Sequence, residues 1–213
     1  MRNKIIRTIV FDAMFIAIIA IMAFVPNIGL ITVSPLISFT LLHIPVLIGA
    51  ALFGWKRGLI YGIAFGLLTL IQAATQPRGA FDPLFINPLI SVLPRALFGL
   101  VAGFSFELLR KMPRLYQKGL FIAATSLVMT LFHTFLVITS IWLVYKADVL
   151  RILQIQDTQS FHWINFIGLL AIVFGALIEA GIAAVITPAI AVPIYHKYPF
   201  LLNKKEQNNE TRP

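Results

Sequence analysis

The stretch FDPLFINPLISVLPRALFGLVAG, Phe81 to Gly103, places an arginine inside a segment that is otherwise apolar enough for lipid. A cation near the bilayer centre costs about 2.5–3.5 kcal/mol on insertion scales and usually faces a partner, a cavity or a ligand. Asn87, Ser91 and Arg95 recur every four residues, so a helix would carry them on one polar stripe about 12 Å long. We interpret this stripe as a wall of a binding site; the alternative is that Arg95 only pairs with Glu179 or extends to the interface.

Three prolines interrupt the same stretch, at Pro83, Pro88 and Pro94. Proline is tolerated in membrane helices where neighbouring groups or a cavity satisfy the backbone carbonyls that it leaves without a donor. The prolines are therefore compatible with a membrane helix that lines a site.

Composition identifies the class of protein. The 213 residues are 59% hydrophobic and 12% charged, and the mean hydropathy of +0.91 lies far outside the range of soluble domains. The chain has no cysteine, which excludes disulfides, thiolate metal sites and a cysteine nucleophile. Its net charge of +9 resides in short loops and tails instead of one basic face, so we expect no nucleic-acid partner.

The apolar runs predict an all-α integral membrane protein, a bundle of six transmembrane helices. Residues 1–198 would form this membrane domain and residues 199–213 a polar cytoplasmic tail. A structured outer loop is expected over Pro26–Pro35, and a longer one, able to carry a short surface helix, over Lys146–Phe161. The six predicted spans are Ile9–Phe24, Leu36–Phe53, Gly58–Thr75, Leu84–Leu108, Gly119–Tyr145 and Trp163–Tyr195.

The basic residues predict the orientation. Most of the 17 Lys and Arg residues lie in the amino end, the tail and the turns after the second and fourth spans, whereas Arg78, Lys146 and Arg151 lie in the opposite loops. The positive-inside rule then puts both termini in the cytoplasm. The polar stripe therefore opens outward.

Several polar residues of other spans would converge on this stripe. Gln72 and Asn87 would lie near the outer mouth, with His43, Arg95 and His133 at the floor. A small polar solute could bind there, and an anionic group would meet the arginine, which can hold a carboxylate with two parallel hydrogen bonds. Each residue also has a plainer interpretation, since a lone histidine is often a packing residue and Gln72 could be solvated.

Small residues form two further stripes. Gly58, Gly62 and Gly66 recur every four residues and predict close packing of the third span against a neighbour. Ala13 and Ala17 form an AxxxA pair in the first span, which serves either internal packing or the approach of a helix from a partner.

The search for catalytic and energy-coupling motifs is negative. The chain contains no GxxxxGK[ST], HExxH or GxSxG sequence and no paired metal-ligand spacing. We therefore expect no enzyme activity, no catalytic residue, no metal and no cofactor. A clear internal repeat with paired broken helices, typical of secondary transporters, is also missing. The class of protein that remains after these exclusions is a binding module that needs an external motor.

Three segments together resemble a known family. AMFIA (Ala13–Ala17), HIPVLIGAALFGWKRG (His43–Gly58) and FINPLISVLPRALFGLVAG (Phe85–Gly103), in a short chain of six spans, are similar to the substrate-binding S components of energy-coupling factor (ECF) vitamin transporters. The NPLISVLPR segment looks most like the pantothenate-specific members. The similarity extends over nearly the whole chain except the tail.

The resemblance implies a multi-pass protein of a bacterial cell membrane that captures a vitamin, pantothenate first of all, from outside. It implies ATP-driven uptake through a transmembrane coupling (T) subunit and two ATPase subunits, with Ala13 and Ala17 docking on the T subunit while the S component topples in the bilayer. The alternatives are an S component for hydroxymethylpyrimidine, pyridoxine or riboflavin, or a membrane-embedded enzyme or sensor that uses His43, His133 and Glu179.

Overall fold

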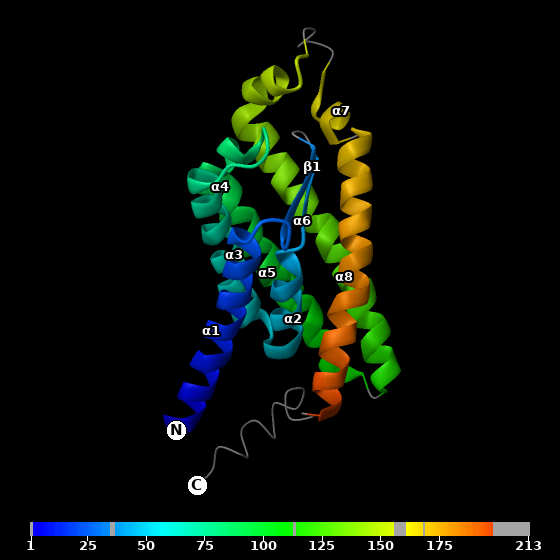
Figure 1. Ribbon diagram of the computed structural model, residues 1–213. Helices are drawn as coiled ribbons and strands as arrows, with labels where there is room; N and C mark the ends of the chain where they lie inside the picture. Colours follow the sequence, from blue (N-terminus) through cyan, green and yellow to red (C-terminus); the bar gives the residue numbers. More distant parts are fainter. Residues whose placement is uncertain (1, 35–36, 113, 156–160, 168, 198–213) are drawn as a thin grey trace.

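The computed structural model describes residues 2–34, 37–112, 114–155, 161–167 and 169–197, and it is mostly helical (Figure 1). The helices are α1 (Arg2–Phe24), α2 (His43–Phe53), α3 (Trp55–Thr75), α4 (Pro88–Ser91), α5 (Leu93–Phe106), α6 (Leu115–Ile152), α7 (Trp163–Ile167) and α8 (Leu170–Lys197). Two 3-10 helices, η1 (Asp82–Ile86) and η2 (Glu107–Lys111), and two strands, β1 (Leu30–Ser34) and β2 (Ile37–Thr40), complete the described elements.

Within the described residues, four helical segments are long and apolar enough to cross a membrane. They are α3, the nearly continuous α4–α5 segment Pro88–Leu109, α6, and Ile172–Lys197 of α8. The apolar part of α1, Ile9–Phe24, and helix α2 are shorter. The predicted membrane character is confirmed, whereas the count of six spans stays a prediction.

The second predicted span is wrong at its amino end. Residues Leu36–Phe53 do not form one helix, because β2 pairs with β1 as an antiparallel hairpin in which Leu30 lies opposite Thr40 and Ile31 opposite Phe39. Both strands are rich in Ile, Val, Thr and Phe, whose branched or aromatic side chains favour strands over helices. Helix α2 therefore has only 11 residues, and His43 is its first residue instead of lying near mid-span.

The last two predicted spans also have different limits. Helix α6 is 38 residues long and extends to Ile152, inside the predicted loop Lys146–Phe161. Non-helical dihedral angles at Tyr145 mark a kink between its two parts. The predicted sixth span is divided into the short α7 and the long α8. The predicted tail, residues 199–213, lies outside the described residues.

Glycines bring α3 and α5 into close contact, as the four-residue spacing predicts. A Cβ atom on Gly58 would clash with the carbonyl of Gly99, and a Cβ on Gly62 would clash with the carbonyl of Arg95. Only glycine, which has no Cβ atom, fits at these two positions. Helix α3 therefore lies directly against the backbone of α5 that carries Arg95.

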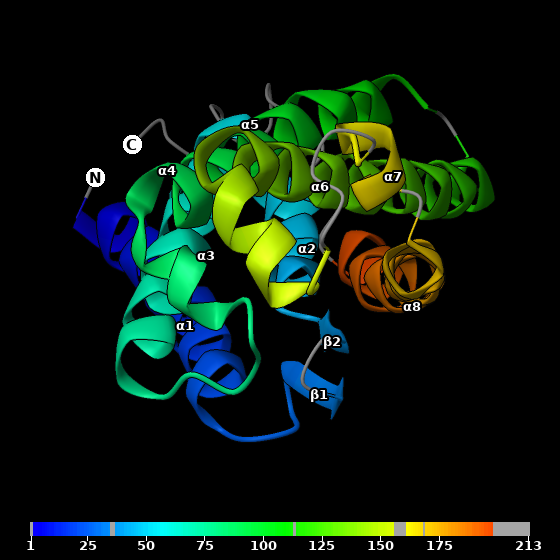
Figure 2. The same cartoon turned by 90° about the horizontal axis from the view of Figure 1, so that it is seen from above.

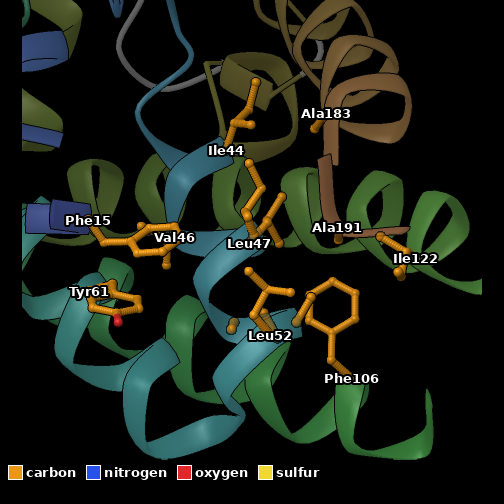
Figure 3. Close-up of a cluster of buried hydrophobic side chains, with 14 of the residues drawn as sticks. Phe15, Ile44, Val46, Leu47, Leu52, Tyr61, Phe106, Ile122, Ala183 and Ala191 are labelled. Atoms are coloured by element: carbon orange, nitrogen blue, oxygen red, sulfur yellow. The ribbon is translucent and has the colours of Figure 1, made fainter. Parts of the chain in front are cut away.

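Helix α2 lies at the centre of the bundle, between α3 and α8 (Figure 2). Its residues from His43 to Leu52 are all buried, and Val46, Leu47 and Leu52 lie in a core cluster to which α1, α3, α5, α6 and α8 also contribute (Figure 3). A short, apolar helix that is buried on every side is consistent with a central structural role.

A polar network joins α1 to α3 at the edge of this core. The hydroxyl of Tyr61 donates a 2.7 Å hydrogen bond to Asp12, and Arg57 forms a 3.0 Å ion pair with the other carboxylate oxygen of Asp12. The ring of Tyr61 stacks on Phe15 with 5.1 Å between centroids (Figure 3). Polar and aromatic contacts therefore hold α1 against α3.

The two ends of the bundle differ in structure. Helix α1 begins and α8 ends at one end, while the hairpin, α4 and α7 lie at the other (Figure 1). The second end contains an apolar cluster that includes Leu84, Ile90, Ile141 and Phe166. The backbone N–H of Thr40, at the end of the hairpin, donates to the Glu179 carboxylate of α8.

Candidate functional site

Arg95, in the first turn of α5, is only 4% exposed. Its Nη1 atom donates hydrogen bonds to the carbonyls of Ile90 and Ser91, at 2.9 and 3.0 Å. Its Cζ atom lies 4.9 Å from the ring centroid of Phe65 and 5.0 Å from that of Phe85. The guanidinium is thus held by two backbone carbonyls and two aromatic rings.

No carboxylate of the described residues balances the charge of Arg95. Among the described residues, ion pairs join Arg57 to Asp12 and Arg151 to Asp148. Glu179 accepts a hydrogen bond from the backbone N–H of Thr40 and forms no ion pair with Arg95. The Nε atom of Arg95 is buried without a hydrogen-bond partner. Buried charges are ordinarily paired, whereas the hydrogen-bond partners of Arg95 among the described residues are neutral carbonyls.

Two histidines lie next to the arginine. His133, from the middle of α6, is 5.5 Å from Phe65 and 5.0 Å from Phe98, measured between ring centroids. The His43 ring stacks on it at 6.0 Å. Both imidazoles are buried, and none of their four nitrogens has a partner with good hydrogen-bond geometry, although the backbone of Thr40 lies near His43.

The other predicted site residues have hydrogen bonds of their own. Ser91 is fully buried beside Arg95, and its hydroxyl donates to the carbonyl of Phe85. Asn87 caps α4 by accepting from Leu89 N, and its amide donates to the Tyr145 hydroxyl at 3.4 Å. The Gln72 amide donates to the carbonyl of Gln76. Contacts therefore connect Arg95, Ser91, His43 and His133, whereas Asn87 and Gln72 lie outside this group.

Sequence reasoning missed the aromatic residues that hold the site together. Phe65 contacts both Arg95 and His133, and Phe98 contacts both histidines. A signal for Phe65 existed, since it follows Gly62 by three residues on the helix face that packs against α5. Phe85 gave no such signal, because it reaches Arg95 only through the fold of η1.

A separate apolar groove lies between α1, α2 and α8. Its volume is about 540 Å³, and its lining residues include Phe11, Met14, Ile44 and Ile190. None of the predicted substrate-binding residues lines it. Ala13 and Ala17 are exposed, as a docking role requires, and lie on a different side of α1 from the groove.

The residues around Arg95 carry the chemical groups that a small anion with additional polar groups would need. The guanidinium has one donor, Nε, without a partner, the imidazoles have nitrogens able to bind hydroxyl or amide groups, and the rings of Phe65, Phe85 and Phe98 pack around these groups. The described residues contain no cluster of His, Asp or Glu that could hold a metal ion.

Comparison with known proteins identifies the family. A family model described as "ECF transporter, substrate-specific component" matches residues 7–191. The chain belongs to this family. It is thus an S component of a transporter family, not a member of an enzyme family, and its apolar helices make it a multi-pass membrane protein.

Two curated relatives resemble this S component. A protein of Leuconostoc mesenteroides named "Pantothenate transporter PanT" is 34% identical over 110 residues, which cover 50% of this chain and 54% of the relative. A protein of Lactococcus lactis named "Pantothenic acid transporter PanT" is 30% identical over 154 residues, which cover 64% of this chain and 73% of the relative. The first match thus spans about half the length of that relative.

A solved structure has the same fold. The S component for biotin from an ECF-type ABC transporter superposes with a TM-score of 0.56, covering 89% of this S component and 93% of the other chain. Sequence identity is 18%, so this similarity concerns the fold alone.

Proposed function

We propose that this S component captures pantothenate from outside the cell and delivers it for ATP-driven uptake by partner subunits. The observation that carries the proposal is Arg95, a buried guanidinium without a counter-ion among the described residues. Pantothenate brings one carboxylate, two hydroxyls and an amide. Its carboxylate would neutralise Arg95, and the imidazoles of His43 and His133 would bind its hydroxyls or amide.

The names of both curated relatives support this substrate. A carboxylate alone does not select it, because biotin also carries one. The neighbouring imidazoles, whose nitrogens have no partner of good hydrogen-bond geometry among the described residues, favour a ligand with several hydrogen-bonding groups near its carboxylate, as in pantothenate.

The partners in this proposal are a transmembrane coupling subunit and two ATPase subunits in a bacterial cell membrane. The exposed Ala13 and Ala17 of α1 would form the docking face, since small residues let helices approach closely. The end of the bundle at which α1 begins and α8 ends would be cytoplasmic, in agreement with the basic residues near that end.

The test is ligand binding to the detergent-purified chain. Isothermal titration should give pantothenate the highest affinity among pantothenate, biotin, pyridoxine, riboflavin and hydroxymethylpyrimidine, and mass spectrometry should find pantothenate unchanged after incubation. Tighter binding of another vitamin would overturn the substrate, and chemical conversion of the ligand would overturn the transporter role.

A further inference from the structure

Pro94 leaves a backbone carbonyl without its usual partner. In an α-helix the carbonyl of residue 90 accepts from the N–H of residue 94, and proline has no N–H. The helical hydrogen bonds from Val92 N to Pro88 O, at 2.8 Å, and from Ala96 N to Val92 O, at 2.9 Å, lie on the two sides of the junction at Val92 between α4 and α5. The carbonyl of Ile90 therefore lies at this junction, and Pro94, in the first turn of α5, has no N–H to donate to it.

The guanidinium of Arg95 takes the place of the missing N–H donor. Its Nη1 atom donates to Ile90 O, the carbonyl that Pro94 leaves free, and also to Ser91 O. Two buried carbonyls inside an apolar segment are thereby satisfied by the side chain of the next residue after the proline. Pro94 and Arg95 act as a pair in this arrangement.

This pairing determines which edge of the arginine stays free. Nη1 donates to two backbone carbonyls, those of Ile90 and Ser91. Nε is buried without a partner, and the hydrogen bonds recorded for the guanidinium within the described residues come from Nη1 and not from Nη2. Nε and Nη2 together form one of the two-donor edges with which arginine binds a carboxylate through parallel hydrogen bonds.

Two further contacts restrain the guanidinium. The rings of Phe65 and Phe85 lie within 5.0 Å of Cζ, and the Ser91 hydroxyl fixes the backbone of Phe85 by donating to its carbonyl. The backbone of Arg95 itself lies against Gly62 of α3. The side chain is thus positioned from both ends before a ligand arrives.

We propose that Pro94 is a positioning residue of the ligand site. Because Pro94 cannot donate to the carbonyl of Ile90, this carbonyl accepts from Nη1 of Arg95 instead. The arginine is thereby oriented so that its Nε–Nη2 edge receives the ligand carboxylate. The inference rests on the proposed function, because it assigns the edge of Arg95 that binds the vitamin. It gives Pro94 a role that differs from bending a helix.

The test compares Pro94→Ala with Pro88→Ala, using pantothenate and its alcohol analogue, in which CH2OH replaces the carboxylate. Alanine at 94 returns an N–H to Ile90 O and so competes with Arg95. Pro88 is an exposed proline of the same segment, and the carbonyl four residues before it, Leu84 O, already accepts from Asn87 N. Pro94→Ala should weaken pantothenate binding about tenfold, the scale of one hydrogen bond to a charged group, and change alcohol binding less than about twofold. Pro88→Ala should change neither affinity.

The outcomes separate this inference from the proposed function. Arg95→Ala should reduce the affinity for pantothenate much more than for the alcohol, and adding Pro94→Ala to Arg95→Ala should cause no further loss. If Arg95→Ala weakens both ligands equally, the carboxylate assignment itself is wrong. If Arg95→Ala discriminates between the ligands but Pro94→Ala weakens both alike or neither, only the positioning role is overturned.

A second measurement reads ligand binding on the unmodified chain and needs a variant only to assign one signal. With arginine labelled by ¹⁵N, the Nε–H signal that disappears in Arg95→Lys identifies Arg95. Saturating pantothenate should shift this signal, whereas the alcohol analogue should leave it in place. An Nε–H signal that pantothenate does not move would refute the proposed edge.

Discussion

The rings of His43 and His133 stack 6.0 Å apart, although one residue begins α2 and the other lies in the middle of α6. Their nitrogens have no hydrogen-bond partner of good geometry among the described residues. Unpaired buried polar groups cost free energy that folding alone does not recover, so these imidazoles are the part of the site whose hydrogen bonds a ligand would complete.

Replacing His133 by phenylalanine keeps a ring of similar size and removes both nitrogens. We expect pantothenate binding to weaken by about 1–3 kcal/mol, because ligand groups then enter the site without partners. The ligand-free protein should unfold at the same or a higher temperature. Titration calorimetry and thermal unfolding in detergent measure the two effects.

His196→Phe, at an exposed position of α8, is the matched control and should change neither quantity. A His133→Phe protein that binds pantothenate normally would remove His133 from the site.

Removing the guanidinium tests the charge pairing. Arg95→Ala should weaken pantothenate binding by about 2–5 kcal/mol, because the carboxylate would be buried without a partner. Arg95→Lys should restore only part of the affinity, since an ammonium group cannot form the planar pair of hydrogen bonds. Calorimetric titration of each variant gives the numbers, and full recovery in Arg95→Lys would argue against a bidentate contact.

The contact between α3 and α5 can be tested at Gly62. A Cβ atom there would clash with the carbonyl of Arg95, so Gly62→Ala should cost about 1–3 kcal/mol of stability and displace the arginine. Pantothenate affinity should therefore fall together with the unfolding temperature.

Gly181→Ala supplies the control, because a Cβ on this exposed glycine of α8 would have nothing within 4 Å. It should leave binding unchanged and raise stability by up to about 1 kcal/mol through helix propensity. Equal effects of the two substitutions would mean that the α3–α5 contact does not position the site.

The docking face can be separated from the ligand site. Substituting both Ala13 and Ala17 by tryptophan adds bulk to an exposed side of α1 without touching Arg95. Pantothenate should bind the isolated variant normally, whereas cells that carry it with the partner subunits should take up no labelled vitamin, because a partner helix cannot approach. Unimpaired uptake would place the docking surface elsewhere.

Local periodicity was sufficient to predict some of this structure. The four-residue spacing of Gly58, Gly62 and Gly66 correctly indicated a close helix contact, and an arginine in an apolar segment correctly indicated a buried side chain. Both predictions need only the geometry of one helix. The family was also predicted correctly from three sequence segments.

Features that depend on distant parts of the chain were not predicted. Hydropathy did not distinguish the strand Ile37–Thr40 from the start of a membrane helix, because a short apolar run is compatible with both. Phe85 contacts Arg95 only because η1 and the Ser91 hydroxyl place it there. The free Nε–Nη2 edge likewise follows from how the folded helix uses Nη1, which residue spacing does not specify.

The Asp12 network has a mechanical consequence. Tyr61 and Arg57 fasten α1 to α3, and the glycines of α3 in turn hold the backbone of Arg95. A pull on α1 would have to break an ion pair and a hydrogen bond or carry α3 with it, and α3 cannot slide over Gly62 without displacing α5. We therefore expect α1, α3 and α5 to move together as one rigid unit, so that a force applied at Ala13 and Ala17 would reach the side chain of Arg95 through three helices in series.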